Sequence, residues 1–105
     1  MAESLSKAPS EYLGSVSAEA GEAFRALRNA LLDSGPLDRV TCELIMISNL
    51  ASAGYEDSFK IHAKRLLDAD VPMAALKQAV VVPLGGSTVI FPVARALLWL
   101  EELER

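Results

Sequence analysis

The longest apolar stretch of this sequence limits how the chain can fold. Residues 78–94, QAVVVPLGGSTVIFPVA, contain no charged side chain, which raises the question of a membrane span. A transmembrane helix needs about 20 consecutive apolar residues. This stretch is shorter, and Pro83, Gly85–Gly86 and Pro92 interrupt it. Because proline and paired glycines end or bend helices, we expect a buried corner made of helix, loop and helix, and no membrane association.

The other segments have apolar residues at helical spacing between turn residues. We expect helices over residues 17–33, 37–53, 56–69 and 72–82, and a last helix that is capped by Ser87 or Thr88, runs to Glu104 and could bend at Pro92. β-branched residues at 80–82 and 88–93 are compatible with a strand, but no other segment would pair with it. The predicted fold is all-α, a compact bundle of about five helices around an antiparallel pair, 37–53 and 56–69.

Composition restricts the partners. The chain has 105 residues, enough for one domain. Of these, 51% are hydrophobic, which is more apolar surface than the core of one small monomer easily buries. We therefore expect self-association. The net charge of −4 and the lack of a basic patch argue against nucleic acid.

The N-terminal residues and the number of cysteines indicate in which cellular compartment the protein is expected. Residues 1–16 are polar, lack the apolar core of a secretion signal, and are expected to form a flexible leader with at most a short helical turn near Glu11–Leu13. The single cysteine, Cys42, excludes an intrachain disulfide framework. A cytoplasmic protein with one helical domain over residues 17–105 is the prediction.

Glu43 occupies an unusual position in the segment 37–53. Its neighbours at helical spacing, Val40, Ile47 and Leu50, are all apolar, so Glu43 is expected to point inward. A buried carboxylate is costly unless it is paired or protonated. Arg39, four residues away, is one candidate partner.

The single histidine, His62, lies on a similar face of the segment 56–69. Residues at helical spacing from it are Tyr55, Ser58, Phe59, Leu66 and Ala69, whereas the opposite face carries Glu56, Lys60 and Lys64. If His62 meets Glu43, the carboxylate would fix the imidazole tautomer, and Tyr55 and Ser58 would hold a substrate oxygen. The alternative is a structural hydrogen bond without chemistry.

Two segments resemble a known family. SGPLDRVTCEL (34–44) and HAKRLLDADVPMAALKQAVVV (62–82), with His62 following Glu43 by 19 residues, are similar to the carboxymuconolactone decarboxylase family, which includes the AhpD-like alkylhydroperoxidases. The resemblance implies an AhpD-like helical fold. Tyr55 and Ser58 stand where the peroxidases keep Cys-x-x-Cys, so a dithiol peroxidase is excluded.

For the decarboxylase branch, the resemblance implies cofactor-free acid–base chemistry, decarboxylation or isomerisation, on a small acidic lactone or related carboxylate. His62 would transfer the proton and Glu43 would orient it. Arg95, the one cation of the last apolar helix, is a candidate for binding the substrate carboxylate, with a salt bridge or a subunit contact as the alternative. No metal or other cofactor is expected.

The last helix is apolar on nearly every side, which supports the homotrimer or homohexamer that the resemblance implies. Its apolar residues are Val89, Ile90, Phe91, Val93, Leu97, Leu98, Trp99, Leu100 and Leu103. Two alternatives to a carboxy-lyase stay open. One is a non-catalytic oligomeric binding or scaffold protein that keeps the family core, and the other is a redox protein working through Cys42.

Overall fold

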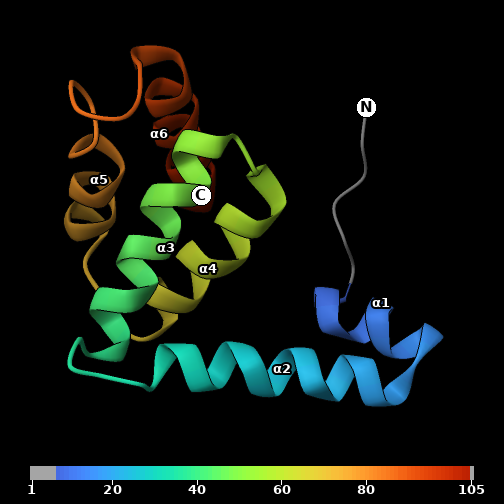
Figure 1. Cartoon of the computed structure of the whole chain (residues 1–105). Coiled ribbons are helices and arrows are strands. Elements are labelled where there is room, and N and C mark those ends of the chain that lie inside the picture. The colour runs from blue at the N-terminus through green and yellow to red at the C-terminus, as the bar shows by residue number, and fades with distance from the viewer. Residues whose placement is uncertain (1–6, 105) are drawn as a thin grey trace. The chain divides into compact units, whose positions relative to one another are not determined.

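The computed structural model describes residues 7–104. This part of the chain contains six α-helices and no strand. Figure 1 labels the helices α1 (Pro9–Val16), α2 (Ala18–Leu32), α3 (Arg39–Ala53), α4 (Glu56–Asp68), α5 (Met73–Val81) and α6 (Ile90–Glu104). The all-α prediction is confirmed. The described residues divide into two compact units, with the division between Arg39 and Val40. A single domain over residues 17–105, and an antiparallel central pair, stay predictions.

The N-terminal unit contains α1 and α2. The Ser17 side chain caps α2, as predicted, by accepting a hydrogen bond of 3.1 Å from the backbone N–H of Ala20. Helix α1 is longer than the short turn that the sequence suggests, since it covers eight residues. Pro9 stands in its first turn, where a proline needs no backbone N–H. Residues 1–6 of the predicted leader lie outside the described residues.

Two glycines let α1 and α2 approach each other closely. A Cβ added at Gly21 would lie 2.8 Å from the Cα of Gly14 and 2.9 Å from the carbonyl oxygen of Ser10. Both distances are shorter than real Cβ contacts, so only glycine fits at position 21 without a shift of the backbone. This close packing explains why α1 forms although its sequence shows weak helix signals.

The C-terminal unit contains α3 to α6 around one hydrophobic core. The most buried side chains come from all four helices and include Ile47, Phe59, Leu76, Val80 and Leu100. The ring of Trp99 packs against that of Phe59, with 5.4 Å between the ring centroids. Each such side chain contributes about 1.5–3 kcal/mol through its removal from water.

The ends of the helices follow local backbone rules. Gly54 ends α3 with a φ of +80°, and Asp70 follows α4 with a φ of +65°. Both angles lie in the left-handed region, which glycine occupies freely and Asp tolerates better than most residues. The predicted stops of both helices are therefore confirmed.

The loop between α5 and α6 corrects the predicted start of the last helix. Helix α6 begins at Ile90, so Val89 and neither Ser87 nor Thr88 directly precedes it. Pro92 therefore falls in its first turn, where its missing N–H breaks no helical hydrogen bond. Leu84 and Thr88 form an isolated bridge across the loop. Among the described residues, no helix is both long and apolar enough to cross a membrane.

Candidate functional site

The structure brings Glu43 and His62 together. The Nδ1 atom of His62 on α4 lies 2.9 Å from the Oε2 atom of Glu43 on α3. Both side chains are nearly buried, with exposed fractions of 11% for His62 and 9% for Glu43. A hydrogen bond to an ionised acceptor in such surroundings is stronger than one in water.

The faces of the two helices explain this meeting. On α3 the buried residues are Glu43, Ile47 and Ala51, spaced four apart along one stripe. On α4, His62 lies beside Phe59 and Ala63, which are also buried. Glu43 thus extends an apolar stripe of α3 that packs into the core, and the imidazole of α4 supplies its polar partner.

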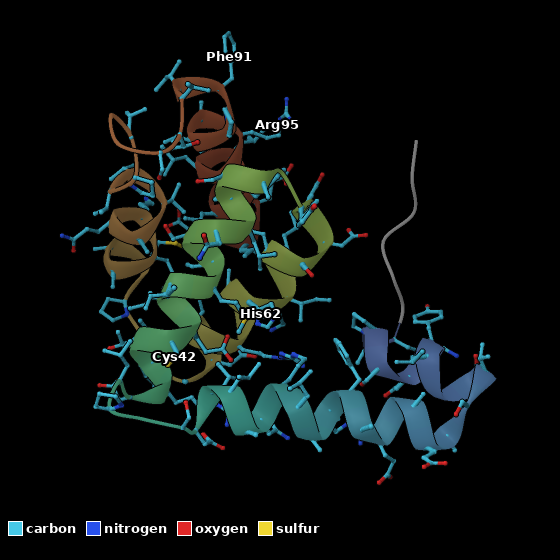
Figure 2. The ribbon with its side chains drawn as sticks, viewed as in Figure 1. Cys42, His62, Phe91 and Arg95 are labelled. Carbon is cyan, nitrogen blue, oxygen red and sulfur yellow. The ribbon has the colours of Figure 1, made fainter. Side chains whose placement is uncertain are left out.

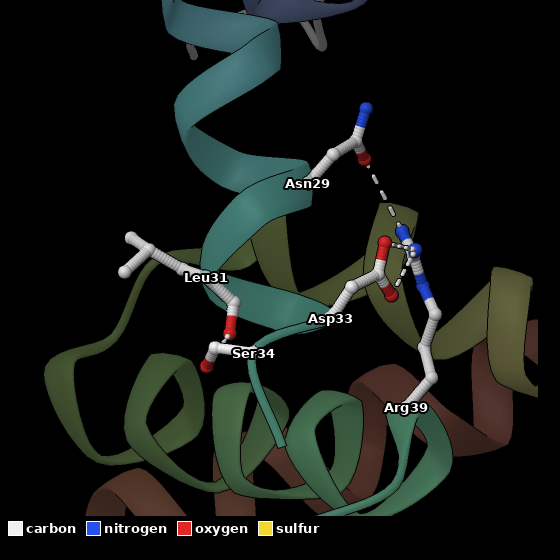
Figure 3. Close-up of polar contacts among 5 residues, drawn as sticks. All are labelled: Asn29, Leu31, Asp33, Ser34 and Arg39. Atoms are coloured by element: carbon white, nitrogen blue, oxygen red, sulfur yellow. Dashed lines mark hydrogen bonds and ion pairs between the residues drawn. The ribbon is translucent and has the colours of Figure 1, made fainter.

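Two details of the predicted stripe on α3 are wrong. Val40 is 43% exposed and does not share the buried stripe. Arg39 does not pair with Glu43. Its Nη1 atom lies 3.1 Å from Oδ1 of Asp33, and its Nη2 donates to Oδ1 of Asn29 at 3.4 Å (Figure 3). The Arg39–Glu43 pair that the i,i+4 spacing suggested does not form, because Asp33 at the end of α2 binds the guanidinium instead.

The Glu43–His62 geometry sets what the imidazole can do. When Nδ1–H donates to the Glu43 carboxylate, the neutral ring carries its lone pair on Nε2. A ring held in this way takes a proton at Nε2, and the carboxylate stabilises the imidazolium that results. The same hydrogen bond also gives each of two nearly buried polar side chains a partner, which a protein without enzymatic activity needs as well. The geometry is therefore compatible with a structural role too.

Tyr55 and Ser58 precede His62 at the N-terminal end of α4. Tyr55 is 63% exposed at the start of α4, and its carbonyl accepts the N–H of Phe59 at 2.9 Å. Ser58 is half-buried one turn before His62. The 2.9 Å contact of His62 Nδ1 is made with Glu43, not with Tyr55 or Ser58.

Arg95 does not lie at the pair. Figure 2 shows it near Phe91, in the first half of α6 and away from His62. Its side chain is exposed, and no ion pair within residues 7–104 includes it. Cys42, half-buried on α3, is the single cysteine of the chain. No group of three His, Cys, Asp or Glu residues in this part of the chain is placed to hold a metal ion.

A pocket that the sequence did not predict lies elsewhere on α3. It has a volume of about 330 Å³ and is formed by α3 and α5. Its lining residues are Thr41, Leu44, Ile45, Ser48, Asn49, Ala75, Gln78, Ala79 and Val82. They include neither Glu43 nor His62. The spacing of Thr41, Leu44 and Ser48 indicates a second face of α3, but the hollow itself depends on where α5 packs.

One of three comparisons with known proteins identifies a family for this chain. A search of curated proteins found no match, and neither did a search of solved structures. The family model described as "Carboxymuconolactone decarboxylase family" matches residues 18–102, which is most of the chain. The absence of a Cys-x-x-Cys pair fits the single cysteine. The chain therefore belongs to the carboxymuconolactone decarboxylase family.

Proposed function

We propose that this protein is a cofactor-free acid–base enzyme of the carboxymuconolactone decarboxylase type. Its substrate would be a small acidic lactone or a related carboxylate. The observation that carries the proposal is the 2.9 Å contact between His62 Nδ1 and Glu43 Oε2 with both side chains nearly buried. Such pairs of a base and an orienting acid are typical of proton-transfer sites.

The proposed reaction uses the proton carried by His62. In a decarboxylation, the bond between carbon and the carboxylate breaks and CO₂ leaves. The electron pair of the broken bond moves into the unsaturated lactone. The imidazolium of His62 then delivers its proton to carbon, while Glu43 holds the ring. In an isomerisation, neutral His62 first removes a proton from carbon and returns it at another position. Both routes balance without a metal or an oxidant.

The experiment monitors proton transfer directly. The protein is incubated in D₂O with a panel of small lactone acids, and NMR follows CO₂ loss and deuterium incorporation at carbon. The wild type is expected to turn over one member. His62→Gln should lose at least a hundredfold in rate, because general acid–base catalysis contributes about 10²–10⁴-fold. Cys42→Ser, as the matched control, should keep its activity.

Equal turnover by wild type and folded His62→Gln would contradict the proposal. So would an imidazole whose NMR signals neither titrate between pH 5 and 8 nor shift with any ligand. The single histidine makes this assignment unambiguous.

The second candidate is a non-catalytic binding or scaffold protein. Among the described residues, every buried side-chain nitrogen or oxygen has a partner, and the α3–α5 pocket does not include His62. Under this function, His62→Gln lowers the stability of the protein and no ligand moves the imidazole signals. The deuterium experiment separates the two functions.

We also propose self-association into a homotrimer or homohexamer, in the cytoplasm. Large apolar side chains remain exposed on the C-terminal unit, among them Ile45, Val82, Val89, Ile90 and Phe91. Exposed apolar patches usually mark protein contacts.

A further inference from the structure

We draw no further inference here: the strongest candidate, the apolar pocket between α3 and α5 that Leu44, Ile45, Ala79 and Val82 help to line, is open at the surface, and nothing in the structure shows what covers it.

Discussion

Single residues on the buried faces of α3 and α4 show how far helical spacing predicts structure. The apolar neighbours of Glu43 and His62 indicated that both point inward, and the two side chains do meet at 2.9 Å. The partner of Arg39 was not predictable in this way. Arg39 pairs with Asp33 because Asp33 lies close to it directly after α2 ends. That position depends on a turn rather than on spacing along one helix.

The Glu43–His62 hydrogen bond is expected to contribute to stability whether or not it serves catalysis. Glu43→Leu leaves the nearly buried Nδ1–H without its acceptor, which should lower the free energy of unfolding by about 1–3 kcal/mol. Glu43→Gln offers an amide oxygen at the same place and should cost less. Urea denaturation of both variants measures the difference, and an equal loss in the two would contradict this account.

Gly21 and Gly14 form a matched pair for testing the contact between α1 and α2. Gly21→Ala forces a Cβ to within 2.8 Å of the Gly14 backbone, and such overpacking should destabilise the contact by about 1–3 kcal/mol. The Cβ of Gly14→Ala meets nothing within 4 Å, so the better helix propensity of Ala should stabilise α1 by up to about 1 kcal/mol. Hydrogen exchange of the α1 amides measures both, and faster exchange in Gly14→Ala would refute the argument.

At the scale of the helices, capping and turn residues predicted most boundaries. Ser17, Gly54 and Asp70 mark helix ends through their own backbone and side-chain chemistry, which is local. Helix α1 was largely missed because its stability comes from packing on α2. The start of α6 was placed one or two residues early, because Ser87 and Thr88 belong instead to the loop that follows α5. The α3–α5 pocket was missed because it arises from packing between helices.

Lys60 joins α4 to α6 through two carboxylates. Its Nζ lies 2.8 Å from Oε2 of Glu56 and 2.8 Å from Oε1 of Glu102. The hydrogen bond to Glu102, followed by that to Glu56, raises the pKa of Lys60 above the ordinary value of 10.5. The charged lysine is therefore favoured in the folded state. Its contribution to stability is complete below the unfolded pKa and is lost as pH rises through the folded pKa.

The Lys60 bridge predicts a pH-dependent difference between variants. Lys60→Gln should lower the free energy of unfolding by up to about 1 kcal/mol at pH 7, as exposed or half-exposed pairs do. The difference from wild type should shrink above pH 10.5. Lys64→Gln removes a more exposed pair with Asp68 and serves as the control. A difference that grows at high pH would have the wrong sign and would reject the account.

For the whole molecule, the division between Arg39 and Val40 predicts that the C-terminal unit folds without the N-terminal one. The core residues, from Ile47 to Leu100, lie within residues 40–105. A fragment of these residues should fold cooperatively, although a domain of roughly 60 residues buries only about 60% of its unfolded surface and is correspondingly less stable. Far-UV circular dichroism during thermal unfolding checks this. A fragment without a cooperative transition would show that residues 1–39 are needed for the core.

The buried position of Trp99 determines what fluorescence can report. The chain has one tryptophan, which is 4% exposed beside Phe59 in the core of the C-terminal unit. Its emission therefore reports the unfolding of this unit. The helices before residue 40 contain no tryptophan, so tryptophan fluorescence does not report their unfolding directly. A single smooth fluorescence transition is thus no proof of two-state unfolding, and agreement with a backbone probe is the test of whether the two units unfold together.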